Sequence, residues 1–252
     1  MTAVDYEKLA PFYDRLVADD DDVEFFVNLS RQAPGRVIEL MAGSGRVSIP
    51  VASEDVPLTC VDSSPAMLAE LRRKLLMQGL SAEVVQQDVT RLNLDSRFAL
   101  AFLAFNSFEE LTEDADRDSL LRSVFTHLLP KGRFVCTLHD PEVRLRDVES
   151  GREREWRFED HDGRQILLRL CTTFDKERSL VRGRESLQDL TSGEVIADLP
   201  LCFRLTSAEE FRSLALGVGF TVETVYGGYN YHRYAAGQSS RMVWVLGRPE
   251  AV

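Results

Sequence analysis

The stretch VIELMAGSGRVSIP at residues 37–50, followed by LTCVDSSPAML at residues 58–68, decides the fold class of this chain. The first stretch starts as an apolar, β-branched run that carries an acid, Glu39, and then turns through two glycines into a helix signal. The second stretch is a further apolar strand pattern that ends at the carboxylate of Asp62. Together they are typical of a nucleotide-type cofactor site at the edge of a parallel sheet.

The residues around these two strands have the backbone properties that such a site requires. Gly43 and Gly45 allow a tight turn in which the backbone comes close to a ligand. After the second strand, Ser64 is a suitable N-cap, Pro65 suits the first helical position, and Gly79 suits the position after the last turn. The sequence therefore predicts a helix that begins at Pro65 and ends before Gly79.

Strand and helix patterns continue to alternate after this helix, as in a doubly wound sheet. We predict a third strand at residues 82–87, which ends at Asp88, and a fully buried fourth strand at residues 98–104. An amphipathic helix at residues 116–129 and a fifth strand at residues 132–138 follow. The first half of the chain is therefore expected to form an α/β domain.

The pattern changes in the second half of the chain. Between residues 156 and 204, alternating segments are separated by turn residues, which predicts the antiparallel strands of a small inserted sheet. A helix is expected after Ser207, an N-cap with Glu210 at the capping-box distance, and the runs FTVETVY and RMVWVLG predict two closing strands. The predicted fold class is α/β: a doubly wound, mostly parallel seven-stranded sheet with a C-terminal antiparallel hairpin and a small inserted antiparallel sheet.

Composition restricts the class of protein further. The chain has 252 residues, of which 44% are hydrophobic, and a formal net charge of −11, which argues against a nucleic-acid partner because phosphates require a basic surface. No apolar run reaches about 18 residues and no basic-plus-apolar leader is present, so we expect a soluble, cytoplasmic protein without a membrane partner. Cys60, Cys136, Cys171 and Cys202 lie in separate apolar runs without CxxC spacing, which predicts buried thiols and no metal.

The stretches around the glycine turn and Asp62 resemble the first two motifs of the class I S-adenosylmethionine (SAM) dependent methyltransferases. The closing pair of strands is a further trait of this family and is not expected in a dinucleotide-binding fold. Where a dinucleotide site usually has a third glycine or alanine, this chain has Ser48. Most family members have a glycine two positions before Gly43, where this chain has Met41, whose side chain is expected to point either toward the methionine end of SAM or into the core.

Within the family, the chain is similar to small-molecule members, the bacterial sugar-amine and glycine-type N-methyltransferases that carry a comparable inserted sheet. This resemblance implies N-terminal lid helices in residues 1–35 and a Rossmann-like SAM-binding domain in residues 36–141 and 206–252. Residues 142–205 are then expected to form the inserted sheet that covers the substrate pocket.

The resemblance implies SAM as the cofactor and S-adenosylhomocysteine as its product. Glu39 is expected near the ammonium group of SAM, Asp62 at the ribose hydroxyls and Met67 beside the adenine. Asp88 is expected to accept a hydrogen bond from the adenine amine, and Val89 to donate one from its backbone N–H. The implied cofactor-binding residues are Tyr13, Glu39, Ala42, Gly43, Gly45, Asp62, Ser63, Met67, Asp88, Val89 and Phe105.

Residues that follow the fourth, fifth and sixth strands are candidates for the substrate pocket, because ligands in an open α/β sheet bind beyond the carboxyl ends of the strands. These residues are Asn106 and His139 and, in the loop GGYNYHRY, Tyr229 and His232. Histidine can take a proton near neutral pH, so His139, which directly follows a buried strand, is the predicted general base. The alternative is that His139 is a hydrogen-bonded structural residue.

We therefore predict a SAM-dependent methyltransferase that acts on a small-molecule acceptor, an amine. A natural-product hydroxyl is the alternative acceptor, and a SAM-binding protein without transferase activity is the alternative of another class. No cluster of acids resembles the magnesium site of catechol-type enzymes, so no metal is expected, and a homodimer is left open.

Overall fold

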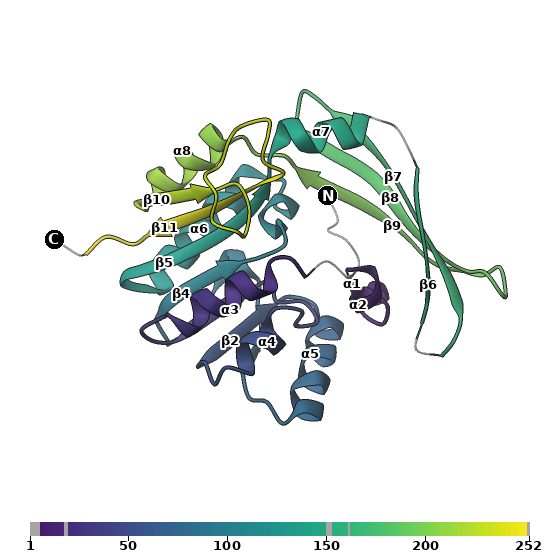
Figure 1. The fold of residues 1–252 in the computed structure, drawn as a ribbon, viewed down its shortest axis with the longest axis horizontal. Helices are drawn as coiled ribbons and strands as arrows, with labels where there is room; N and C mark the ends of the chain where they lie inside the picture. Colours follow the sequence, from purple (N-terminus) through teal and green to yellow (C-terminus); the bar gives the residue numbers. More distant parts are fainter. Residues whose placement is uncertain (1–5, 18–19, 150–152, 161, 251–252) are drawn as a thin grey trace.

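Two β-sheets form the framework of the protein (Figure 1). The structure is a computed structural model that describes residues 6–17, 20–149, 153–160 and 162–250. In Figure 1 the four-stranded sheet stands apart from the seven-stranded sheet as a curved wall, and two short N-terminal helices lie between them. The seven-stranded sheet has the order β10 (Thr221–Tyr226), β11 (Arg241–Gly247), β5 (Leu128–His139), β4 (Phe98–Leu103), β1 (Val37–Leu40), β2 (Leu58–Asp62) and β3 (Glu83–Gln86).

The strand order of the large sheet creates a single switch point. β1 pairs in parallel with both β2 and β4, and the pairs β2–β3 and β4–β5 are parallel as well. β11 is antiparallel to both β5 and β10, which confirms the predicted doubly wound sheet with its C-terminal hairpin. The chain builds outward from β1 to β3 and then from β4 in the other direction, and ligands of such sheets bind at the switch point between β1 and β4.

Helices cover both faces of the seven-stranded sheet. They are α3 (Val23–Arg31), α4 (Ser48–Ala52), α5 (Pro65–Gln78), α6 (Asp114–His127) and α8 (Ala208–Val218). Adjacent residues of a strand face opposite sides, so Ile38 of β1 packs in a cluster with residues of α6 and α8. Val37, one position earlier, packs with residues of α3, α4 and α5. The parallel strands β1, β2 and β4 are therefore buried on both faces, whereas the edge strand β3 is partly exposed.

The helix predicted after Asp62 is α5, and its ends are as predicted. The hydroxyl of Ser64 accepts a hydrogen bond from the backbone N–H of Met67 at 3.2 Å. Gly79 follows the last turn in a left-handed conformation with φ of 65°, which a side chain would disfavour. The Ser64 cap fixes the first turn of α5 directly after β2, and Gly79 ends the helix.

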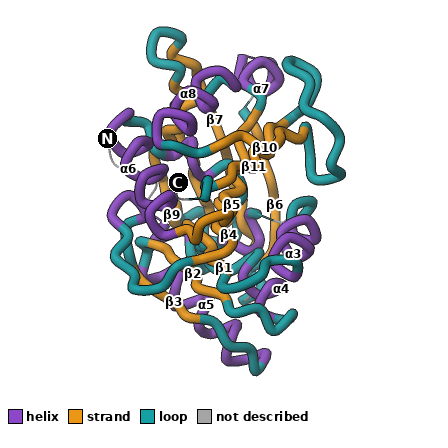
Figure 2. The backbone as a smooth tube through the Cα atoms, turned by 90° about the vertical axis from the view of Figure 1, so that its left-hand side faces the viewer, coloured by secondary structure: helices purple, strands orange, loops and turns teal. Residues whose placement is uncertain are grey.

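The four-stranded sheet is the predicted insertion. The chain leaves β5 through α7 (Pro141–Glu149), a helix that was not predicted, and then forms four consecutive antiparallel strands. Figure 2 shows the two sheets from a direction at right angles to that of Figure 1. The strands are β6 (Arg154–Glu159), β7 (Gln165–Asp175), β8 (Leu180–Asp189) and β9 (Val195–Arg204).

One predicted boundary is wrong for a structural reason. The helix predicted at residues 116–129 is α6, which ends at His127. Leu128 already pairs with Phe98 of β4, so the last two residues of the predicted helix belong to β5. Pairing with a buried neighbouring strand thus overrides the helical spacing of these two leucines.

Two of the four cysteines also differ from the prediction. Cys60 and Cys136 are buried in the large sheet, whereas Cys171 is exposed and Cys202 is half-buried. Each of the latter alternates along its strand with a neighbour that lines a cavity, Leu170 or Leu201, and therefore faces the other side of the inserted sheet.

The N-terminal segment fills the space between the two sheets. It forms two single-turn helices, α1 (Tyr6–Leu9) and α2 (Tyr13–Leu16). Leu9 and Phe12 belong to an apolar cluster with Ile166, Leu187 and other residues of the inserted sheet. The rings of Tyr6 and Tyr13 meet edge to face, with centroids 6.0 Å apart. The segment therefore packs against the insertion while its tyrosines face the large sheet.

Candidate active site

A cavity of about 430 Å³ lies at the carboxyl ends of β1, β2 and β3. It is the place where the switch point of the sheet predicts a ligand. Residues from the N-terminal helices and from the segment after β4 complete its wall. The predicted cofactor-binding residues that line it are Tyr13, Gly43, Asp62, Ser63, Met67, Asp88 and Val89.

Asp62 joins the ends of β1 and β2 at this cavity. Its Oδ2 accepts a hydrogen bond from Gly43 N, and its Oδ1 accepts one from Ser64 N, both at 2.8 Å. Burial raises the pKa of this carboxyl above its ordinary value, and the two backbone N–H groups oppose that change. A carboxylate held in this way keeps oxygen lone pairs directed into the cavity, where it can accept hydrogen bonds from neighbouring hydroxyl groups.

The two glycines of the turn serve different purposes. Gly43 has φ of +56°, and a Cβ on it would meet only Tyr13, at 3.9 Å, on the cavity side. Gly45 has φ of +90°, and a Cβ there would lie 2.4 Å from Leu71 Cδ1 of α5. Gly43 therefore opens the cavity, whereas Gly45 lets the turn pack against α5 without lining the cavity itself.

Three residues other than glycine have left-handed backbone at the strand ends that form the site. These are Met41 after β1, with φ of 52°, and Phe105 and Asn106 after β4, with φ of 55° and 58°. Such conformations cost free energy for a residue with a side chain, and they often occur at functional sites. The left-handed backbone of Met41 thus explains why most members of the family that this chain resembles have a glycine at this position. Its side chain lines the cavity of Asp62 and also packs against the core.

Replacement of Met41 by glycine is expected to keep or improve cofactor affinity. The change relieves a left-handed backbone and removes a side chain from the cavity wall. We expect the dissociation constant for S-adenosylhomocysteine, measured by calorimetry, to stay within about threefold or to fall. A tenfold loss of affinity with unchanged thermal unfolding would instead mean that the thioether contributes to binding.

The carboxyl of Glu39 is buried beneath the glycine turn. It accepts a hydrogen bond from the Ser48 hydroxyl, and burial raises its pKa to about 8. Ala42 is also buried, and neither residue is among the described residues that line the cavity of Asp62. In the structure, the contact of Glu39 is with Ser48, which follows the glycine turn. The predicted contact of Glu39 with the ammonium group of SAM stays a prediction.

The buried carboxyl of Glu39 leads to a prediction for stability. A glutamate of the unfolded chain ionises near pH ~4.3, whereas Glu39 in the folded protein keeps its proton to about pH 8. Between these two pH values the folded state therefore binds more protons than the unfolded state. The free energy of unfolding then falls as the pH rises. Replacement of Glu39 by glutamine removes this loss. We expect the variant to gain more than ~1 kcal/mol of unfolding free energy relative to the unmodified protein between about pH 5 and pH 8, measured by urea denaturation. Parallel pH curves for the two proteins would contradict this expectation.

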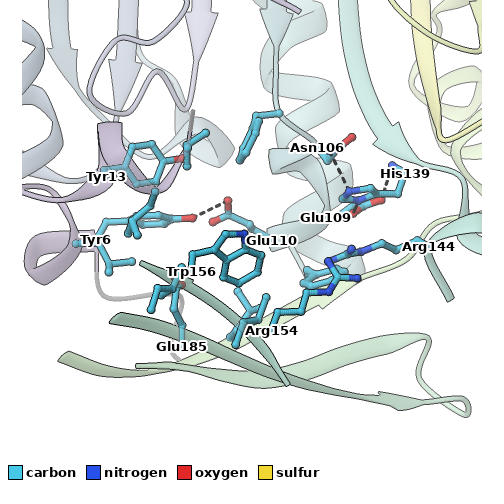
Figure 3. Close-up of a pocket in the computed structure, with 18 of the residues that line it drawn as sticks. Tyr6, Tyr13, Asn106, Glu109, Glu110, His139, Arg144, Arg154, Trp156 and Glu185 are labelled. Atoms are coloured by element: carbon cyan, nitrogen blue, oxygen red, sulfur yellow. Dashed lines mark hydrogen bonds and ion pairs between the residues drawn. The ribbon is translucent and has the colours of Figure 1, made fainter. Parts of the chain in front are cut away.

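A second and larger cavity, of about 520 Å³, adjoins the first. Tyr6, Tyr13 and Glu110 line both cavities, so the two share a wall. Figure 3 shows the larger one, with the tyrosines on one side and residues of the inserted sheet, including Trp156 and Glu185, across from the large sheet. The inserted sheet therefore covers this cavity.

His139 is held in one orientation at the end of β5. Its Nδ1 lies 2.7 Å from Glu109 Oε2, and its backbone N–H donates to Glu109 Oε1 at 3.0 Å. Glu109 is only 2% exposed, so it is well placed to accept the Nδ1 proton. The Nε2 atom then carries the lone pair, and it lies 3.3 Å from the amide nitrogen of Asn106. Nε2 is therefore the acceptor atom of the ring, and a molecule in the larger cavity has to replace the Asn106 amide to give it a proton.

Two further carboxyl groups line the larger cavity. Glu110 Oε1 accepts a hydrogen bond from the Tyr6 hydroxyl at 2.9 Å, and burial raises the pKa of Glu110 to about 7. Burial also raises the pKa of Glu185, which reaches the cavity from β8. Acidic groups on opposite walls give part of this cavity a preference for hydrogen-bond donors or positive charge.

The other predicted substrate residues are only partly brought together. Asn106 and Tyr229 line the larger cavity with His139. Phe105, which was predicted to bind the cofactor, lines this larger cavity and not the smaller one. His232 lines neither of them but a separate cavity on the loop between β10 and β11. The backbone N–H of Gly227 donates to the carbonyl of His232 at 2.9 Å, and this tight turn holds the histidine beside the start of its own loop.

Sequence reasoning missed the residues that orient His139 and those on the far wall of the cavity. Glu109 and Glu110 lie on a short 3-10 helix (Ser107–Glu110) directly after β4. Their position at the carboxyl end of a strand was the available signal, since this edge of the sheet was already predicted to bind ligands. Glu185, Arg144 and Arg154 also line this cavity, and no local pattern in the sequence indicates that they do so.

Comparisons with known proteins identify similar sequences and similar folds. Residues 37–132 match a family model described as a methyltransferase domain. The cypemycin N-terminal methyltransferase of Streptomyces sp is 27% identical over 224 residues, which cover 88% of this chain and 87% of that protein. The CcbJ methyltransferase of Streptomyces caelestis superposes with a TM-score of 0.76 at 22% identity, covering 92% and 90% of the two chains. For the sugar N-methyltransferase KedS8 of Streptoalloteichus sp, the TM-score is 0.74 at 19% identity, with 94% and 92% covered.

Proposed function

Because residues 37–132 form a methyltransferase domain with the class I fold, we propose that this protein transfers the methyl group of SAM to an amine of a small-molecule acceptor. The observation that carries the proposal is the pair of adjoining cavities. One has the lining expected for a nucleoside, and the other holds an oriented histidine. The names of two similar proteins, an N-terminal methyltransferase and a sugar N-methyltransferase, support an amine as the acceptor.

The residues of the smaller cavity fit SAM in their chemistry. We propose that Asp62 accepts hydrogen bonds from the ribose hydroxyls and that Asp88 and Val89 bind the adenine. The open space at Gly43 and the aromatic face of Tyr13 leave room for the methionine portion. When bound, SAM supplies an electrophilic methyl group on a positively charged sulfonium. The protein then has to position the acceptor and remove its proton.

We propose that His139 takes this proton at Nε2, with Glu109 holding the imidazole in the required tautomer. Asn106 contacts the same ring and positions it from the other side. Glu110 and Glu185 favour an amine in the cavity because both are acidic. A hydroxyl acceptor is the second candidate, since an oriented histidine can equally activate a hydroxyl group.

Two measurements test this function. Calorimetric titrations should show binding of SAM and of S-adenosylhomocysteine, and a labelled-methyl assay over a panel of amines and alcohols should show transfer to an amine. Transfer to alcohols alone would support the second candidate. Binding of SAM without transfer to any member of the panel would support a SAM-binding protein without transferase activity, and no binding would contradict the cofactor assignment.

The net charge and the helices of the chain guide what we propose about its partners and its location. The net charge of −11 is unfavourable for a nucleic-acid partner, and we propose a small molecule as the partner instead. Within the described part of the chain, no helix is long and apolar enough to cross a bilayer. We propose that the protein is cytoplasmic and that residues 142–205 cover the acceptor. Light scattering measures whether the protein is a monomer or a homodimer.

A further inference from the structure

Arg144 and Arg154 bring two guanidinium groups to one end of the larger cavity. Arg144 lies on α7 and Arg154 begins β6, and both line the cavity. Figure 3 shows the two side chains converging beneath His139 and Glu109. The side chain of Arg144 is 16% exposed and that of Arg154 is 37% exposed, so both charges are partly removed from water.

These two arginines have weak partners within the protein. Asp147 Oδ2 lies 3.7 Å from one terminal nitrogen of Arg144 and 3.5 Å from one of Arg154. Both distances exceed the ~2.7–2.9 Å that is typical of a hydrogen bond between charged groups. The Nε atom of Arg144 is buried and has no hydrogen-bond partner among the residues that the structure describes. Much of the donor capacity of the pair is therefore unused.

The environment of Arg144 makes this arrangement unfavourable unless an anion is present. Burial lowers its pKa, and the positive charge of Arg154 lowers it further. The charges of Asp147 and Glu109 oppose this effect, but both oxygens of Glu109 already accept hydrogen bonds from His139. The guanidinium of Arg144 lies 5.4 Å from the ring centroid of Phe203, and the His139 ring is 6.3 Å from the same centroid. The arginine pair is thus within the length of a small molecule from the proposed base.

We propose that the methyl acceptor carries a carboxylate, which Arg144 and Arg154 bind beside His139. This inference rests on the proposed function, because it names a chemical group of the acceptor for the same cavity. Guanidinium groups bind carboxylates through paired hydrogen bonds. The positive charges of Arg144 and Arg154 and the negative charge of Asp147 together leave about one positive charge, which matches a monoanion. A phosphate dianion fits less well, since Glu110 and Glu185 line the same cavity.

The body of the acceptor is expected to be apolar. Trp156, Leu170 and Leu201 line the cavity next to the arginines. Phenylacetate therefore serves as a minimal probe, and phenylacetamide serves as a neutral control of nearly the same shape. Binding can be followed by tryptophan fluorescence, because Trp156 lines the cavity whereas Trp244, the other tryptophan of the chain, is fully buried.

The test titrates both probes into the full-length protein, with and without S-adenosylhomocysteine. We expect phenylacetate to bind at least tenfold more tightly than phenylacetamide, and we expect R144Q and R154Q each to reduce this preference, with the double variant abolishing it. R144K, which keeps the charge but loses the paired hydrogen bonds, should retain part of the preference. R169Q is the matched control: Arg169 belongs to the same inserted sheet, bonds Glu155 and does not line the cavity, so the preference should be unchanged.

Several results would overturn the proposal. The first two are equal binding of the two probes and no binding of phenylacetate. A preference for phenylacetate that survives in the correctly folded double variant is the third. The fourth is tighter binding of phenyl phosphate than of phenylacetate, which would point to a phosphate ester instead. Circular dichroism establishes that the variants fold. The binding of S-adenosylhomocysteine, measured separately, distinguishes a failure of this inference from a failure of the proposed function.

Discussion

Replacement of His139 by alanine is expected to lower the turnover of methyl transfer by ~10²–10⁴-fold. The imidazole stands in the acceptor cavity with Nδ1 directed at the buried Glu109, so its Nε2 is the atom that can take a proton from the acceptor. The affinity for SAM should stay nearly unchanged, because His139 lines only the larger cavity. Single-turnover rates and calorimetry measure the two quantities separately.

Two further variants separate a base from a positioning residue. H139N keeps a hydrogen-bonding group but cannot take a proton near neutral pH, and it should be as slow as the alanine variant. E109Q keeps the shape of Glu109 but removes the charge that holds the Nδ1 proton, so we expect a smaller loss and a changed pH profile. If the asparagine variant restores the rate, His139 only holds the acceptor and proximity carries the catalysis.

Replacement of Asp62 by alanine is expected to weaken SAM binding by ~2–4 kcal/mol while the fold stays intact. The carboxylate is partly buried at the end of β2, and both of its oxygens are fixed by backbone N–H groups. Its removal takes away charge-assisted hydrogen bonds to the ribose that water in the cavity replaces only partly. Calorimetry with SAM measures the loss, and thermal unfolding checks the fold.

Asp88 provides the comparison for this prediction. It lines the same cavity, but it is exposed and its Oδ1 already accepts from the backbone N–H of Thr90 at 2.9 Å. D88A should therefore weaken SAM binding less than D62A does, because the backbone N–H of Val89 remains available to the adenine. A folded D62A protein with unchanged affinity would contradict the assignment of Asp62.

The sequence predicts the strand ends, caps and turn around the smaller cavity because the signals for them are local. Strand ends, caps and glycines lie within a few residues of the groups that they position, so Asp62, Ser64 and Gly79 were found without knowledge of the tertiary structure. The role of Gly45 was harder to predict, because its constraint is a contact with Leu71 on another element.

The acceptor side was predicted less completely, because its residues meet only through tertiary structure. Glu109 and His139 are 30 positions apart and come together because β4 and β5 are neighbours in the sheet. Arg144 lies on α7 and Arg154 lies on β6, the edge strand of the inserted sheet, and only the tertiary structure brings both to one cavity. The path of the loop between β10 and β11 was equally hidden, and it holds His232 in a different cavity.

The most direct test of the account is a crystal structure of the complex with S-adenosylhomocysteine. We predict that its ribose hydroxyls bind Asp62, that its adenine lies beside Met67 and Asp88, and that its sulfur faces the larger cavity toward His139. A ligand bound elsewhere, or one whose sulfur points away from the larger cavity, would contradict the proposed transfer of a methyl group between the two cavities.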